Sequence, residues 1–170
     1  MRAADSCQDD EMITQSRLKE LLRYEPETGK FFWLANKGRG KPTKAAGCIG
    51  GKGYRRIGID DADYSTSRLV WLYVYGKFPD DECDHRDGNR DNNCLTNLRE
   101  ATHSQNLQNR RKAQARSKTG FLGVWKKRTK FAAGIRFCGK TIHLGSFATP
   151  EEAYASYLAK KREIHAFCTI

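Results

Sequence analysis

The stretch Asp84-His85-Arg86-Asp87-Gly88-Asn89, which runs on through further asparagines to Asn106, decides how this sequence is interpreted. It gathers one imidazole, a carboxylate directly before it and several amide side chains. His85 can take a proton from water near neutral pH. Asp84 and Asn106 offer the hard oxygen ligands that magnesium prefers. The set suits hydrolysis of a phosphodiester with one divalent metal ion, which would stabilise the charge that develops on the phosphate.

A purely structural interpretation of these residues has to be weighed as well. Asn, Asp and Gly are common in loops because Asx side chains cap turns and glycine tolerates a positive φ. Asp87-Gly88 is also typical of a simple tight turn. Asn89, Asn92 and Asn93, taken one at a time, fit loop structure better than catalysis. The ordered succession of short motifs favours a functional site over a plain loop.

Six short motifs here resemble the HNH homing endonucleases of bacteriophages, which carry a His-Asn-His pattern on a β-hairpin, metal and helix unit called ββα-metal. The motifs are Asp84-His85, Asp87-Gly88-Asn89, Asn92-Asn93, Asn97-Leu98-Arg99, Ala101-Thr102 and Gln105-Asn106. The resemblance covers about residues 18–111. It implies a DNA endonuclease that uses one divalent metal ion, Mg²⁺ as the expected ion and Mn²⁺ as a substitute.

The resemblance also implies a role for individual residues. His85 matches the general base, and Asp84 matches the neighbouring metal ligand. Asn97 matches the middle Asn, which orients the base and holds the loop. Asn106 stands at the last position, where many members of the family have His and a subset has Asn. His103 lies three residues earlier on the same helical face, so it is an alternative last ligand.

The charge of the chain is unevenly distributed. Residues 1–100 hold 17 basic and 17 acidic side chains, whereas residues 101–170 hold 14 basic and 3 acidic and so carry the whole net charge of +11. Between Ala101 and Pro150 there are 11 Lys or Arg and no acidic residue. A solvated face normally mixes both signs, so this stretch indicates a polyanionic partner, with nucleic acid as the best candidate. The resemblance to HNH endonucleases makes double-stranded DNA the expected partner. A membrane fits less well, because no long apolar span accompanies the charge.

The six cysteines favour a reducing compartment, because they are scattered, form no Cys-x-x-Cys pair and follow no signal peptide. With the phage resemblance, we expect a protein of the bacterial host cytoplasm. Cys83, His85 and Cys94 could hold zinc, but they lack a fourth ligand and paired spacing, so ordinary thiols are favoured.

Local patterns predict the elements of the first two thirds of the chain. They are a helix from Thr14 or Ser16 through Leu18, Leu21, Leu22 and Tyr24, strands at 30–34 and 54–59, a buried helix at 66–76 and a helix from about 102 to 112. Between the two strands lies a Gly- and Lys-rich segment, residues 37–53. Its basic side chains fit contact with a DNA backbone better than a mere flexible loop.

The pattern changes after residue 112. The small and polar residues 113–119 are typical of a linker. Three β segments are then expected, at 121–127, 131–137 and 140–147. Thr149, Pro150 and Glu152 predict the start of a helix, with Thr149 as N-cap and Glu152 completing a capping box. The apolar face of this helix would cover the sheet.

This C-terminal part resembles the ethylene-response-factor type of DNA-binding domain of plants, which also occurs joined to phage HNH nucleases. The resemblance covers about residues 119–167 and is carried by Gly123-Val124-Trp125, Phe131-Ala132-Ala133-Gly134-Ile135-Arg136, Leu144-Gly145-Ser146-Phe147 and Thr149-Pro150-Glu151-Glu152-Ala153. It implies that a three-stranded sheet lies in the major groove. The DNA contacts would come from Trp125, Lys127, Arg128, Arg136 and His143. Phe131 is expected to pack under the helix. Trp125 fits packing under the helix and contact with DNA equally well.

Together these observations predict an α+β protein. A β-rich N-terminal region and a ββα-metal HNH unit would precede a three-stranded antiparallel sheet packed on one helix. We expect an N-terminal tail at 1–16, an endonuclease domain at 17–112, a linker at 113–119 and a DNA-binding domain at 120–167. The protein would act as a monomer without an obligate protein partner. The alternative is a sequence-specific DNA-binding regulator whose nuclease half is inactive.

Overall fold

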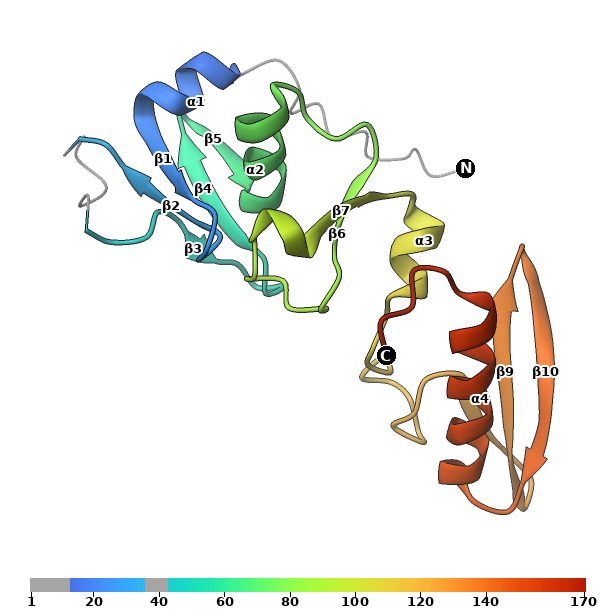
Figure 1. Cartoon of the computed structure of the whole chain (residues 1–170). Helices are drawn as coiled ribbons and strands as arrows, with labels where there is room; N and C mark the ends of the chain where they lie inside the picture. The colour runs from blue at the N-terminus through green and yellow to red at the C-terminus, as the bar shows by residue number, and fades with distance from the viewer. Residues whose placement is uncertain (1–12, 36–42) are drawn as a thin grey trace, which may run out of the picture. The chain divides into compact units, whose positions relative to one another are not determined.

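A computed structural model of the chain describes residues 13–35 and 43–170. The chain forms two compact units, Met1–Ala101 and Thr102–Ile170 (Figure 1). Most of the expected tail, residues 1–12, lies outside the described residues, as does part of the Gly- and Lys-rich segment. The two units divide at Ala101, whereas the sequence puts the end of the nuclease domain at 112, so the expected domain limits stay a prediction.

The described residues of the first unit form small antiparallel sheets and two α-helices. Its elements are α1 (Gln15–Leu21), β1 (Leu22–Glu25), β2 (Lys30–Trp33), β3 (Cys48–Ile49), β4 (Arg55–Ile59), β5 (Ala62–Ser65), α2 (Thr66–Tyr75), β6 (Glu82–His85), the 3₁₀-helix η1 (Leu95–Asn97) and β7 (Leu98–Ala101). The strands pair as β1–β2, β3–β4–β5 and β6–β7. The buried side chains of its core include Leu18, Leu22, Phe31, Ile57, Leu69 and Val70.

The N-terminal helix is shorter than its apolar spacing predicts. Thr14 caps α1 by accepting a hydrogen bond from the backbone N–H of Arg17 at 3.2 Å, as expected for one of the two proposed caps. The prediction that the helix continues to Tyr24 is wrong, because α1 ends at Leu21 and β1 begins at Leu22. Leu22 and Tyr24 also alternate with the period of a strand, and pairing with β2 selects that conformation.

The apolar run after Ser65 forms α2, which confirms the helix expected at 66–76. It ends at Gly76, whose φ of +77° provides a left-handed C-cap. Leu69, Val70 and Leu72 of this helix are buried in the core of the unit. The helix contacts α1, β4 and β5. The strands at 30–34 and 54–59 are also confirmed, as β2 and β4.

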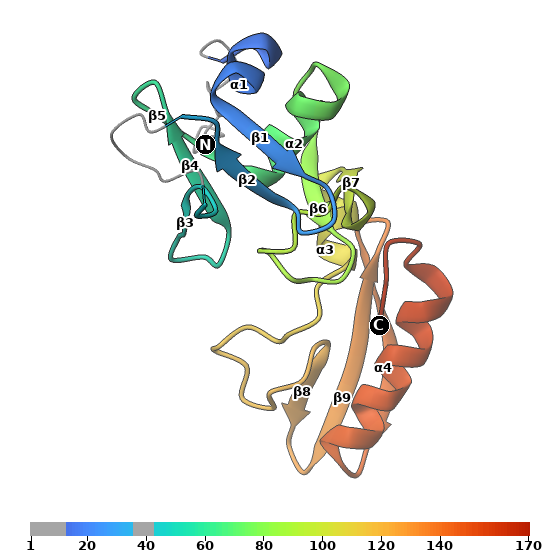
Figure 2. The same cartoon turned by 60° about the vertical axis from the view of Figure 1, so that its left-hand side comes forward.

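The second unit is a three-stranded antiparallel sheet covered by one long helix. Its elements are α3 (His103–Gln108), β8 (Val124–Lys127), β9 (Lys130–Phe137), β10 (Lys140–Phe147) and α4 (Pro150–Ile164). The strand order is β10–β9–β8, and α4 contacts all three strands. Figure 2 shows α4 running along the sheet. Val124, Ala133, Ile135, Ala153 and Tyr157 form the buried core between helix and sheet.

Two capping boxes begin the helices of this unit. Thr149 and Glu152 bond reciprocally at the start of α4, as predicted. Thr102 and Gln105 do the same at the start of α3, which ends at Gln108 and is shorter than the helix expected to reach 112. The expected α+β class, with a three-stranded antiparallel sheet packed on one helix, is confirmed. None of the helices in the described part of the chain is long and apolar enough to cross a bilayer.

Candidate active site and basic surface

The β6–β7 hairpin places Asp84 directly opposite Arg99. Paired residues on neighbouring strands share one face, so the two side chains meet. Arg99 donates to Oδ2 of Asp84 from Nε at 2.9 Å and from Nη2 at 2.8 Å. Both side chains are largely buried, with 12% of Arg99 and 5% of Asp84 exposed. The sequence indicates a metal ion as a partner of Asp84, whereas the ion pair with Arg99 follows only from the strand pairing.

His85 is buried at the end of β6, with 4% of its surface exposed. Its Nε2 lies 3.2 Å from Oδ1 of Asn93. The amide of Asn93 is oriented by its own Nδ2, which donates to the carbonyl of Asp91 at 3.1 Å. Its oxygen therefore faces the imidazole and must accept a hydrogen bond from Nε2. This fixes the tautomer in which Nε2 carries the proton and Nδ1 holds the lone pair.

Burial lowers the pKa of His85 below its ordinary value of 6.5, and the hydrogen bond that His85 donates to Asn93 opposes this shift only in part. The lowered pKa keeps the imidazole neutral at pH 7, which is the form that can accept a proton. The ring of Tyr54 lies 5.9 Å from the imidazole, centroid to centroid. The guanidinium of Arg90 covers Tyr54 at 4.7 Å from its ring centroid.

Asn97 ties together the loop that follows His85. Its Nδ2 donates to Oδ1 of Asp87 at 3.0 Å and to the carbonyl of Asn92 at 2.8 Å. Its Oδ1 accepts from the backbone N–H of Asp87 at 3.0 Å. Asn97 is a buried residue and Asp87 is an exposed one, so these bonds cross-link both ends of the loop at the edge of the core. The ion pair of Arg55 with Asp91, at 2.7 Å, ties the same loop to β4.

The β1–β2 hairpin contacts the backbone of Asn93. No local pattern in the sequence indicates this contact. The hydroxyl of Tyr24 donates to the carbonyl of Asn93 at 2.9 Å, and burial raises the pKa of this phenol to about 12. Gly29 in the hairpin turn has a φ of +66°. A Cβ at Gly29 would lie 2.3 Å from the backbone nitrogen of Cys94 and 2.4 Å from the carbonyl carbon of Asn93. The turn and the loop therefore touch backbone to backbone.

Gly29→Ala should impair any activity that depends on His85. The new methyl group has to push the backbone of Asn93 away, because the nearest atoms that it meets are backbone atoms and not the end of a flexible side chain. Gly53→Ala is the matched control, since its φ is +82° but its Cβ would meet only Cδ of Arg90 at 3.8 Å. We expect roughly 1 kcal/mol of backbone strain in Gly53→Ala and clearly more in Gly29→Ala. Equal melting temperatures and equal cleavage rates for the two variants would contradict the supporting role of the hairpin.

The proposed metal ligands come from both units of the chain. Asp84 belongs to the first unit, and Asn106 and the alternative His103 are carried by α3 of the second. Among the described residues, no three His, Cys, Asp or Glu side chains gather closely enough to hold an ion. The thiols of Cys83 and Cys94 donate to the backbone carbonyls of Ser67 and Glu27, so their own contacts do not indicate zinc.

The donor chemistry of Asp84 fits a hard cation. A carboxylate has about four lone-pair directions, so an arginine on Oδ2 and a metal ion are compatible partners of the same group. The positive charge of Arg99 at 2.8 Å would weaken such binding electrostatically. We therefore expect modest metal affinity at Asp84 unless the phosphates of a substrate add ligands.

The sheet of the second unit presents the predicted DNA-contacting residues on one face. Trp125 pairs with Ala132, and His143 pairs with Gly134 two residues further along β9. Residues two apart in a strand point to the same side, so Trp125, Lys127, Arg136 and His143 share the face opposite α4. Arg128 lies in the β8–β9 turn, with a φ of +55°. All five side chains are exposed.

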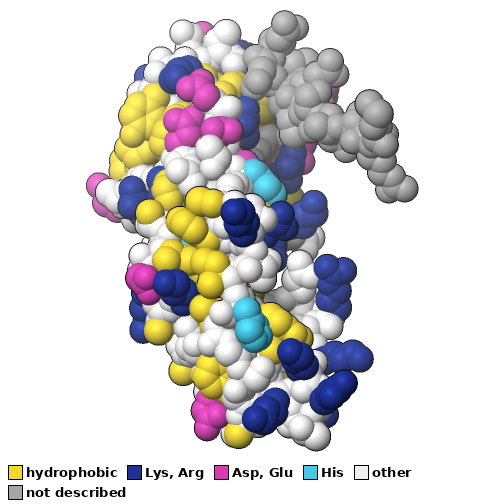
Figure 3. Space-filling view, turned by 90° about the vertical axis from the view of Figure 1, so that its right-hand side faces the viewer, with side chains coloured by type: hydrophobic (Ala, Val, Ile, Leu, Met, Phe, Trp, Pro, Cys, Tyr) yellow, Lys and Arg dark blue, Asp and Glu magenta, His cyan; other side chains and the backbone are white. Residues whose placement is uncertain are grey.

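Trp125 lies on the outer face of the sheet. Its indole is 42% exposed and rests on Gly134, where a Cβ would come 2.9 Å from Cη2 of the ring. The ring of His143 is 6.2 Å away, centroid to centroid. Phe131, by contrast, packs against the core under α4, as expected. In Figure 3 the lower part of the molecule, which is the second unit, shows many Lys and Arg side chains and few Asp or Glu.

Comparison with known proteins agrees with the first of the two resemblances. Residues 64–108 match the family model described as HNH endonuclease. The matched segment begins in β5 and contains α2, the β6–β7 hairpin and α3, and so it includes Asp84, His85, Asn97 and Asn106. No curated protein and no solved structure matches the chain. The HNH match supports a nuclease that acts on DNA.

Proposed function

We propose that the protein is a metal-dependent HNH endonuclease of the homing or nicking type, which hydrolyses phosphodiester bonds of duplex DNA. The observation that carries the proposal is the buried His85 imidazole, whose tautomer is fixed by Asn93 inside the segment that matches the HNH family. In the tautomer that this contact favours, the second ring nitrogen is basic, which is what a general base requires. The monomeric state belongs to the proposal too.

The proposed chemistry assigns one task to each residue. Nδ1 of His85 takes a proton from the attacking water, and Nε2 stays bonded to Asn93 while the ring becomes charged. Asn97 keeps the loop rigid around this ring. Asp84 and Asn106, or His103 in its place, would hold one Mg²⁺ or Mn²⁺ ion. When bound, such an ion stabilises the negative charge on the phosphate and on the leaving oxygen.

The second unit is proposed to bind the duplex as an ethylene-response-factor-type domain, with its sheet in the major groove. The shared exposed face of Trp125, Lys127, Arg136 and His143, continued by Arg128 in the turn, supports this role. The competing function is a DNA-binding regulator with an inactive nuclease half. The presence of Asp84, His85, Asn97 and Asn106 together favours the enzyme, because an inactive nuclease half would be free to lose them.

Nicking of supercoiled plasmid, with Mg²⁺ or with a chelator, tests the proposal. The wild-type protein should nick only with the metal. Asp84→Asn and Asn106→Ala should each need more Mg²⁺ for half-maximal activity, since each weakens an oxygen ligand. Asp84→Asn keeps an acceptor for Arg99, so its fold is preserved better than that of an alanine variant.

His103→Ala is the control for the last ligand and should change the Mg²⁺ requirement less than Asn106→Ala does. The opposite ranking would assign the ligand to His103. Metal-independent nicking, or no nicking together with tight DNA binding, would favour the regulator over the enzyme.

A further inference from the structure

The segment between α3 and β8, expected from its composition to be a linker, is packed onto the second unit. The buried Lys161 of α4 donates to the carbonyl of Arg110, and Arg111 donates to the hydroxyl of Thr169 at 2.5 Å. At the other end, the Thr119 hydroxyl donates to the carbonyl of Val124 at 2.9 Å. These bonds attach both ends of the segment to the second unit.

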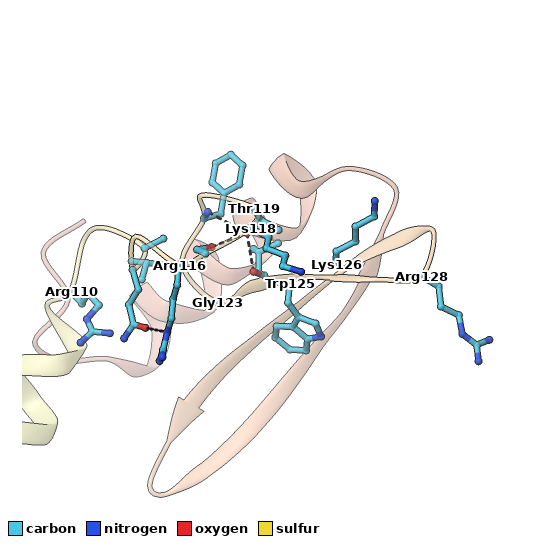
Figure 4. Close-up of a pocket in the computed structure, with 14 residues that line it drawn as sticks. Arg110, Arg116, Lys118, Thr119, Gly123, Trp125, Lys126 and Arg128 are labelled. Carbon is cyan, nitrogen blue, oxygen red and sulfur yellow. Dashed lines mark hydrogen bonds between the residues drawn. The ribbon is translucent and has the colours of Figure 1, made fainter.

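A hollow of about 770 Å³ opens between this segment and β8, the edge strand of the sheet. Figure 4 shows side chains of both walls around it, with Trp125 and Lys126 projecting to opposite sides of β8. Five cationic side chains line it: Arg110, Arg116, Lys118, Lys126 and Arg128. No Asp or Glu occurs among the described residues that line it. Trp125 adds an apolar wall that is continuous with the outer face of the sheet.

The composition of this hollow indicates what it binds. Five cations line the hollow and no carboxylate does among the described lining residues, so an anion that enters it is attracted from several sides. Arg116 has one local partner, since its Nε donates to Oε1 of the exposed Gln114 at 2.7 Å. The volume has room for more than one phosphate group, which matches a repeating anion better than a single small ion.

We propose that the hollow binds the sugar-phosphate backbone of duplex DNA, with Arg116 and Lys118 as phosphate contacts outside the sheet. This site rests on the proposed DNA-binding role of the second unit and extends it to a segment that the ethylene-response-factor resemblance leaves out. Phosphate contacts of this kind fix the register of the protein on the duplex without reading sequence. The backbone of one strand then lies along the edge of β8 while the sheet faces the groove.

The test compares two double variants of the full chain that lose the same charge. Arg116→Gln with Lys118→Gln alters the hollow, and Lys160→Gln with Arg162→Gln alters α4, on the other side of the sheet. Binding to a short duplex is measured in a chelator at several salt concentrations, so that cleavage plays no part. The first variant should bind roughly tenfold more weakly, and its salt slope should fall by about 1.8, roughly 0.9 for each lost contact. The α4 variant should stay close to wild type in both.

Each other outcome has a distinct meaning. Failure of the wild-type protein to bind the duplex would overturn the proposed DNA-binding role itself. Tight wild-type binding with equal losses in both double variants would overturn only the hollow as a site, because bulk charge would then suffice. Poly-glutamate serves as a second probe. If it binds the wild-type protein as tightly as the duplex does, and if Arg116→Gln with Lys118→Gln weakens both affinities equally, the ligand of the hollow is any polyanion and not DNA in particular.

Discussion

His85→Ala should lower the rate of DNA cleavage by roughly 10²- to 10⁴-fold, because removal of a general base typically costs that much. The affinity for duplex DNA should stay near the wild-type value, since the cationic side chains are untouched. The measurement is a single-turnover cleavage assay at saturating protein, combined with a binding titration in a chelator. This pair of experiments separates the chemical step from binding. A folded His85→Ala protein that cleaves at the wild-type rate would remove His85 from the mechanism.

His143→Ala is the matched control for this variant. It also loses an imidazole, but an exposed one on the outer face of the sheet. Its binding should weaken while its cleavage rate at saturation stays unchanged, which is the reverse of the expectation for His85→Ala. Because His85 is buried, the melting temperature of its variant has to be measured too. A loss of rate that follows the loss of folded protein would indicate a structural role.

Gly123→Ala should unfold or strongly destabilise the second unit. The φ of Gly123 is +67°, and an added Cβ would lie 2.2 Å from Cδ2 of Tyr157 and 2.8 Å from the carbonyl oxygen of Gly134. Tyr157 is the α4 side chain that packs into the core between helix and sheet, so the methyl group would drive the two apart. Overpacking and left-handed strain together should cost roughly 3 kcal/mol. Thermal unfolding followed by circular dichroism measures this loss, and DNA affinity should fall with it.

Gly120→Ala isolates the backbone contribution to that loss. Its φ is +74°, close to that of Gly123, but its Cβ would meet no atom within 4 Å. It should cost about 1 kcal/mol, the strain of one left-handed residue. If Gly123→Ala were no worse than Gly120→Ala, the contact between Gly123 and Tyr157 would not be a tight one in solution.

Local signals in the sequence are sufficient for the elements whose stabilising partners lie nearby in the chain. Thr149 and Glu152 predict the start of α4 because a capping box closes over three residues. The β segments expected at 131–137 and 140–147 form β9 and β10 around a tight turn at Gly139, and Gly76 ends α2 at the expected place. Pattern alone fails at Leu22–Glu25, where the spacing fits both a helix and a strand. There the pairing with β2 decides, and such pairing is not a local property.

The candidate site divides in the same way. The sequence by itself determined which chemical groups are present, the Asp84-His85 pair, Asn97, Asn106 and the excess of basic residues after 100, because motif order and composition can be read without a fold. Only the tertiary structure decided which groups face one another. Tyr24 meets Asn93 across 69 positions of the chain, and Arg99 reaches Asp84 through strand pairing. The segment after α3 becomes one wall of a cationic hollow by packing against β8 and α4. These contacts depend on burial and on distant partners, which local sequence patterns do not encode.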